Sequence, residues 1–166
     1  TLCGATVQYY DLYPKAPGER FRVDLAAVEA MCSERTKIVC VNSPSNPTGG
    51  VLTRAEIEGL CRIANRCGAY VVSDEIYDFF CFVDDYSSPV TYADRCIQLG
   101  GYSKTYGVPG WRMGFAVGNE RLLAALAYFV LPADAVPDLI AGIGFTDDAA
   151  AIAAALGTAA RYAPPE

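Results

Sequence analysis

The sequence predicts an α/β protein: part of a three-layer α/β/α arrangement with a mostly parallel sheet, followed by a short all-helical tail. Three observations predict this class. Short apolar runs, typical of strands buried on both faces, alternate with amphipathic helical segments. Polar and glycine-rich segments follow the ends of these runs, where sheets of this kind bind ligands. From about residue 121 the chain becomes alanine-rich and shows no strand pattern.

The first part of the chain contains two strand patterns and one helix pattern. Residues 5–10 (ATVQYY) form a short β-rich run. Residues 24–33 carry apolar residues at helical spacing, and Asp24 can cap the start of that helix. Residues 37–42 (KIVCVN) form an apolar strand that ends at a polar residue and leads into the turn-rich segment SPSNPTGG.

A helix with clear end signals comes next, and three further strands follow it. Residues 53–68 begin with a capping box formed by Thr53 and Glu56, and Gly68 is suited to end the helix. Arg112 is expected to begin the last strand. The three apolar strand patterns cover residues 69–74, 95–101 and 112–118.

The composition of the chain changes near residues 121–124, where it becomes alanine-rich and loses the strand pattern. The later part reads as two short apolar helices, about residues 121–131 and 147–160, joined by a segment rich in proline and aspartate. We therefore expect two domains, residues 1–122 and residues 123–166.

Composition limits the classes of function. The 166 residues are 52% hydrophobic and carry a net charge of −6 without a lysine- or arginine-rich run, which disfavours nucleic-acid binding. The absence of histidine excludes a Ser-His-Asp triad and every histidine-ligated metal site, and we expect no metal. The seven cysteines are scattered and indicate reduced thiols in a cytoplasmic protein. No apolar run reaches the ~20 residues that span a bilayer.

Five chemically active side chains lie next to the predicted strand ends. They are Asn46, Asp74, Tyr77, Lys104 and Arg112. Lys104 lies in the segment GGYSKTYGVPGWRMG, whose glycines allow another molecule to approach the backbone. Together these groups suit pyridoxal phosphate, because its aldehyde needs a lysine, its pyridine nitrogen needs a carboxylate and its phosphate needs a cation.

Each of these residues also has a purely structural interpretation. Lys104 alone could be a loop lysine, and Arg112 could pair with a surface carboxylate. Asp74 could cap the residues after its strand, Tyr77 could be a core aromatic, and the segment SNPTGG around Asn46 could be only a turn. The occurrence of several motifs in order favours the functional interpretation.

Three segments carry a family resemblance. In this order and at these separations, SPSNPTGG, VVSDEIY and GYSKTYGVPGWRMG resemble the class I/II aminotransferases of the aspartate aminotransferase fold. The resemblance covers about residues 4–122. It implies an enzyme that uses pyridoxal 5'-phosphate to transfer an amino group from an amino acid to a 2-oxo acid, and that works as a homodimer.

The resemblance implies a role for each matching residue. Lys104 forms the internal imine with the cofactor and later moves a proton, and Asp74 pairs with the pyridine nitrogen. The other cofactor-binding residues are Asn46 and Tyr77 at the ring oxygen and Arg112 at the phosphate. Ser103 is a further cofactor-binding candidate, which can contribute to the site or can simply be a small residue.

The chain departs from this family in length. Family members are considerably longer, with further phosphate- and ring-binding residues upstream and an arginine for the substrate's carboxylate downstream. Gly101 also stands where many of them carry a phosphate-binding serine. We therefore expect an incomplete site and little transamination by this chain.

The tail has a resemblance of its own. Residues 123–166 resemble the YkvA-like family, small helical domains of unknown function, through a tyrosine, a P-x-D-x-x-P-D segment and paired aspartates. One alternative function is therefore a non-catalytic helical interaction or membrane-associated module with a remnant aminotransferase segment. A second alternative, within the first fold, is a pyridoxal-phosphate-dependent carbon–sulfur lyase.

Overall fold

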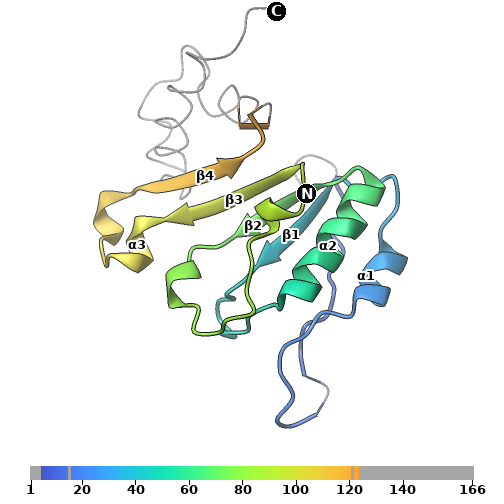
Figure 1. Cartoon of the computed structure of the whole chain (residues 1–166), viewed down its shortest axis with the longest axis horizontal. Coiled ribbons are helices and arrows are strands. Elements are labelled where there is room, and N and C mark those ends of the chain that lie inside the picture. The colour runs from blue at the N-terminus through green and yellow to red at the C-terminus, as the bar shows by residue number, and fades with distance from the viewer. Residues whose placement is uncertain (1–4, 15, 121, 124–166) are drawn as a thin grey trace, which may run out of the picture.

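The computed structural model describes residues 5–14, 16–120 and 122–123 (Figure 1). Apart from residues 122 and 123, the predicted tail helices lie outside the described residues, as does nearly all of the segment that resembles the YkvA-like family. The described residues belong to the predicted α/β part.

A four-stranded sheet forms the centre of the described structure. Its strands are β1 (Ile38–Asn42), β2 (Tyr70–Asp74), β3 (Cys96–Gly101) and β4 (Gly114–Gly118). They lie side by side in the order β1-β2-β3-β4, with β1, β2 and β3 parallel and β4 antiparallel to β3. The predicted α/β class with a mostly parallel sheet is therefore confirmed.

Two helices, α1 (Leu25–Met31) and α2 (Arg54–Cys67), lie next to each other in front of the sheet in Figure 1. The Asp24 carboxylate caps α1 by accepting two backbone N–H groups of its first turn. Helix α2 begins with the predicted capping box and ends at Gly68, whose φ of 66° is a left-handed conformation that glycine adopts without strain. Both helices begin at the predicted caps and α2 ends at the predicted Gly68, whereas α1 ends at Met31, earlier than the predicted residue 33.

Short helical turns occupy the remaining loops. The turn η1 follows β2, η2 precedes β3, and α3 and η3 lie between β3 and β4. Their bounds are Asp78–Phe80 for η1, Pro89–Thr91 for η2, Tyr102–Thr105 for α3 and Pro109–Trp111 for η3.

The main core lies between the helices and one face of the sheet. Along β1 and β2 buried and more exposed side chains alternate, so Val39, Val41 and Val71 point toward α2. They meet Ile57 and Leu60 of α2, both fully buried. This alternation is the period of two that a strand imposes on its side chains.

The opposite face of the sheet is only partly covered by the described residues. Ile97 is buried there, in a small cluster with Leu122 and Leu123. Over β1 and β2, by contrast, Ile38 remains 55% exposed and Tyr70 37% exposed. The described helices α1 and α2 thus supply one of the two helical layers of the predicted arrangement.

Residues 5–10 do not form the strand that their composition suggests. They are assigned no regular structure, and the hydroxyl of Tyr10 donates a hydrogen bond to the carbonyl of Cys40 at 2.7 Å. Burial raises the pKa of Tyr10 to about 12. A β-rich run becomes a strand only when it pairs with another strand, and this run is anchored by a side chain instead.

The last strand begins later than predicted. Arg112 does not start it: β4 begins at Gly114, and Arg112 has a φ of 52° in the left-handed region. That conformation lies outside the extended range of a strand and turns the chain from η3 into β4. Arg112 therefore belongs to the loop that precedes the strand.

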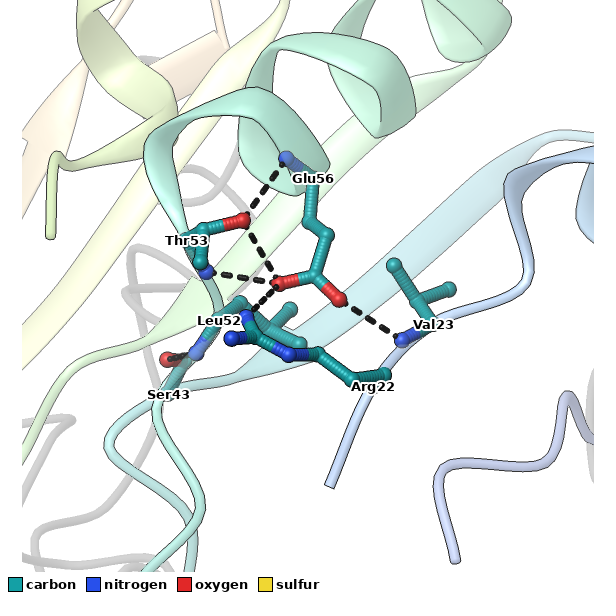
Figure 2. A network of polar contacts seen from close by, with 6 residues as sticks. All are labelled: Arg22, Val23, Ser43, Leu52, Thr53 and Glu56. Atoms are coloured by element: carbon teal, nitrogen blue, oxygen red, sulfur yellow. Dashed lines mark hydrogen bonds and ion pairs between the residues drawn. The ribbon is translucent and has the colours of Figure 1, made fainter. Parts of the chain in front are cut away.

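A buried carboxylate joins the N-terminal segment to α2 (Figure 2). Oε2 of Glu56 accepts the N–H of Thr53 at 2.7 Å and forms an ion pair with Arg22 at 3.0 Å. Its other oxygen, Oε1, accepts the N–H of Val23 at 3.0 Å. Glu56 thus completes the capping box of its own helix and also holds the segment that leads into α1.

Candidate functional site

The parallel strands end together at one edge of the sheet. Asn42, Asp74 and Leu99 lie in register across β1, β2 and β3. Because β4 is antiparallel, its first residue Gly114 pairs with Gly101, near the end of β3. The segments after β1, β2 and β3 and the segment before β4 therefore meet at this edge, which is where open α/β sheets bind ligands.

Asn42 connects two of the predicted motifs. Its Oδ1 accepts the backbone N–H of Asn46 at 3.0 Å, and its Nδ2 lies 3.5 Å from the carbonyl oxygen of Asp74. Asn42 was not among the predicted site residues. The available signal was its place as the polar last residue of the apolar run KIVCVN.

Asn46, Tyr77 and Lys104 come together from three separate loops. The side-chain amide of Asn46 donates to the hydroxyl of Tyr77 at 3.4 Å. The ammonium of Lys104 lies 5.9 Å from the centre of the Tyr77 ring, within the range of a cation–π contact. Lys104 is exposed and Tyr77 half-buried, so a ligand approaching this edge can reach both side chains.

The Asp74 carboxylate is half-buried at the end of β2. Its Oδ1 accepts the backbone N–H of Ile76 at 3.2 Å, a local turn contact that matches the structural interpretation of this residue. No hydrogen bond to Oδ2 occurs within the described part of the chain. One carboxylate oxygen thus orients the group, and the second can accept a donor from a ligand.

Ser103 and Arg112 lie on the connection between β3 and β4. Ser103 is half-buried in α3 and makes no hydrogen bond to another predicted site residue within the described ranges. The guanidinium of Arg112 donates to the carbonyl of Pro109 at 3.4 Å, in its own loop. Ser103 and Arg112 lie at the same edge of the sheet as Lys104. The side-chain contacts described in the paragraphs above connect Asn46, Tyr77 and Lys104 with one another.

A carboxylate that sequence reasoning missed lies beneath the site. Glu75, 1% exposed, follows Asp74 and accepts hydrogen bonds from Ser88 at 2.7 Å and Gln98 at 3.1 Å. Burial raises the pKa of Tyr86 strongly, and the neighbouring Glu75 adds to the shift. Glu75 fastens the turn after β2 to β3 and η2. Its only sequence signal was its place inside the motif SDEIYD.

The described residues show neither a membrane-spanning helix nor a cluster of metal ligands. No helix among them is long and apolar enough to cross a membrane. Within the same ranges, no three cysteine, aspartate or glutamate side chains gather as metal ligands would.

The fold and the sheet edge define an α/β protein with an accessible lysine, a carboxylate, a phenol and an amide at the carboxyl ends of parallel strands. Comparison with known families gives the particular class. The chain belongs to the family described as aminotransferase class I and II, whose model matches residues 1–139. The match includes the first part of residues 123–166, and the boundary predicted at residue 122 stays a prediction.

Curated relatives are named as aspartate aminotransferases. A probable aspartate aminotransferase of Methanocaldococcus jannaschii is 39% identical over 124 residues, which is 70% of this chain and 33% of the relative. An aspartate aminotransferase of Thermotoga maritima is 34% identical over 129 residues, 76% of this chain and 33% of the relative. The chain thus spans about a third of the length of these relatives.

Solved structures show the same similarity. The crystal structure of aspartate aminotransferase from Thermotoga maritima matches with a TM-score of 0.72 and 30% identity, covering 92% of this chain and 39% of that chain. Aspartate aminotransferase from Thermus thermophilus with maleate matches with a TM-score of 0.67 and 31% identity, covering 89% and 37%.

Proposed function

We propose that this chain carries part of the active site of a pyridoxal-phosphate-dependent aminotransferase, which moves an amino group from an amino acid to a 2-oxo acid. The observation that carries the proposal is the meeting of Asn46, Tyr77 and Lys104 at the sheet edge where β2 ends in Asp74. The names of the relatives support an aspartate-type substrate and favour amino transfer over carbon–sulfur lysis.

The donor set fits the cofactor. When bound, pyridoxal phosphate supplies a ring that accepts the electron pair of a broken bond at the substrate's Cα. Lys104 has the amine that would hold the aldehyde carbon, and its exposure leaves it room to move a proton at Cα afterwards. The free Oδ2 of Asp74 would face the pyridine nitrogen, where a negative charge favours the protonated ring.

The remaining residues would orient the cofactor. The amide of Asn46 and the hydroxyl of Tyr77, already 3.4 Å apart, can both donate to the ring oxygen. Arg112 and Ser103 would bind the phosphate, for which a guanidinium offers two parallel donors. The positive φ of Arg112 sets the direction in which its side chain leaves the loop.

The site is proposed as partial because the chain spans about a third of its relatives. We expect residues from outside this segment, and a second subunit, to complete the contacts with substrate. The proposal therefore predicts cofactor capture by Lys104 and little turnover of amino acids by this chain alone. The scattered spacing of the cysteines in the sequence supports a reducing, cytoplasmic location.

Cofactor capture can be tested by absorption and peptide mapping. We expect added pyridoxal phosphate to give a visible absorption band, and borohydride to fix the cofactor to Lys104. Because trypsin does not cleave at a modified lysine, digestion should then yield residues 96–112 as one peptide instead of 96–104 and 105–112.

Two variants control this experiment. Lys104→Ala should abolish both the band and the fixed cofactor. Lys37→Ala should leave them unchanged, because Lys37 is exposed and its amine donates to the Glu34 carbonyl at 3.1 Å, far from the site in sequence and fold. Equal labelling of Lys37 and Lys104 in the wild-type chain would contradict the proposal.

A further inference from the structure

The C-terminal ends of α1 and α2 lie side by side. Cys32 follows the last residue of α1, and Cys67 is the last residue of α2. One turn earlier in α1, Glu29 forms an ion pair with Arg66, the neighbour of Cys67. The two helices therefore run next to each other up to these cysteines. Figure 1 shows α1 beside α2.

Cys32 and Cys67 lie close to each other where the ends of the two helices meet. Both side chains are half-buried and pack against the same hydrophobic core. Burial raises the pKa of Cys32, and the charge of the nearby Cys67 thiol adds to this shift.

The other described cysteines lack this combination of proximity and access. Cys61 and Cys96 are buried, and burial raises their pKa values to about 11 and about 12. Cys40 is exposed on the open face of the sheet, and Cys81 lies in the loop after η1 with its thiol near the Val83 carbonyl. Within the described ranges, Cys32 and Cys67 are the neighbouring pair that a small reagent can reach.

We propose that Cys32 and Cys67 are a redox-active pair that forms a reversible intrachain disulfide with a small disulfide oxidant such as glutathione disulfide. The bond would tie the end of α1 to the end of α2. It would also close the chain into a loop that contains β1 and the Asn46 segment of the proposed active site.

The reaction balances as two thiol–disulfide exchanges. The thiolate of one cysteine attacks a sulfur of glutathione disulfide, forms a mixed disulfide and releases one glutathione thiolate. The thiolate of the second cysteine attacks the protein sulfur of that mixed disulfide, forms the Cys32–Cys67 bond and releases the second glutathione thiolate. The protein loses two electrons and two protons, and two glutathione molecules carry them away.

The test uses the 166-residue chain with glutathione disulfide at pH 8.5, chosen because the raised pKa of Cys32 makes its thiolate scarce near neutrality. Free thiols are then blocked, and tryptic peptides are identified by mass spectrometry. We expect residues 23–35, which contain Cys32, linked to residues 67–95. Because the second peptide also contains Cys81, fragment ions, or the same link in Cys81→Ser, assign the bond to Cys67.

Repeating the oxidation in denaturant shows whether the Cys32–Cys67 link depends on the native packing of the two helices or forms by chance encounter. Native packing should enrich the Cys32–Cys67 link about tenfold or more over the same link in the unfolded chain, because folding removes the cost of closing the loop. Cys67→Ser should lose the link, and Cys40→Ser should keep it. An equal spread of links over several cysteine pairs in the native chain, or the same yield in denaturant, would overturn the proposal.

Discussion

At the scale of single residues, Asp74 divides its two carboxylate oxygens between structure and the proposed chemistry. Oδ1 accepts the Ile76 N–H and fixes the turn after β2, which leaves Oδ2 for a ligand. A substitution of Asp74 could therefore act in two ways, by removing the turn contact of Oδ1 or by removing the charge that Oδ2 offers to a ligand. A change that keeps the turn contact but removes the negative charge addresses the proposed cofactor contact alone.

We expect Asp74→Asn to weaken pyridoxal phosphate binding and to leave the fold intact. The asparagine oxygen can still accept the Ile76 N–H, but the neutral amide no longer favours a protonated ring nitrogen. Hydrogen bonds to charged groups contribute about 1.5–3 kcal/mol, so the dissociation constant should rise about tenfold to a hundredfold. Titration followed by absorption measures it.

Asp78→Asn is the matched control for this prediction. Asp78 lies in the same motif but is exposed, and its carboxylate accepts only the neighbouring Phe79 N–H at 2.7 Å among described contacts. Equal losses of affinity in the two variants would point to a general effect of charge and against the specific role of Asp74.

Some residues of the site could be predicted from the sequence, and others could not. The motifs around Asn46, Tyr77 and Lys104 were visible as local patterns. The bridge that Asn42 makes between Asn46 and Asp74 depends on the register of β1 against β2, which no local pattern encodes. Glu75 was missed for the same reason, because its partners Ser88 and Gln98 come from other elements.

At the scale of helices and strands, the sequence signals that lie within a segment predicted the starts of the helices correctly. Helices α1 and α2 begin at the predicted caps Asp24 and Thr53, since a cap acts over only a few residues. Pairing over longer distances was not predictable in this way. Residues 5–10 have strand-like composition but no strand beside them, and the reversed direction of β4 follows from its pairing with β3.

The pairing of β3 with β4 depends on close contact at Gly118. A Cβ atom at this position would lie well inside van der Waals contact of the Cys96 carbonyl oxygen, which belongs to the backbone and cannot swing away. We expect Gly118→Ala to lower the free energy of unfolding by about 1–3 kcal/mol, the usual cost of overpacking. Urea unfolding followed by circular dichroism measures this change.

Gly110→Ala provides the comparison. A Cβ atom at Gly110 would meet no heavy atom within 4 Å. The free energy of unfolding of the Gly110→Ala chain should therefore stay within about 0.5 kcal/mol of the wild-type value. A Gly118→Ala chain as stable as Gly110→Ala would show that β3 and β4 do not approach each other as described.

At the scale of the whole molecule, Glu56 makes stability depend on pH. Burial alone would raise its pKa, but the hydrogen bonds from Thr53, Val23 and Arg22 outweigh burial, and the pKa lies below its ordinary value of 4.5. A lowered pKa in the folded state stabilises the chain at pH values above 4.5. That contribution disappears as the pH falls through the folded-state pKa.

We expect Glu56→Gln to lower the free energy of unfolding by about 1–3 kcal/mol at pH 7, because it replaces a charged acceptor of several hydrogen bonds. The difference from wild type should shrink as the pH falls below 4.5 and should be lost below the lowered folded-state pKa, where Glu56 is protonated in both states. Urea unfolding at several pH values measures it. Glu58→Gln, on the exposed side of the same helix, should show little change at any pH.

Part of the overall architecture could be predicted from the sequence. The alternation of apolar strand patterns with amphipathic helix patterns predicts a parallel sheet and a layer of helices on it. The apolar strand patterns predicted strands that are buried on both faces. Among the described residues, Leu122 and Leu123 cover the second face near Ile97, whereas Ile38 and Tyr70 stay exposed on it. A sequence shows that a strand is apolar, but not which segment covers it.

The reversal of β4 places Lys104 and Arg112 on a single connection that is fastened at both ends. Gly101 pairs with Gly114, and the Tyr102 N–H donates to the Met113 carbonyl at 3.2 Å. An engineer can therefore insert or remove residues inside this connection to retune the span between amine and guanidinium, while the three parallel strands keep their register.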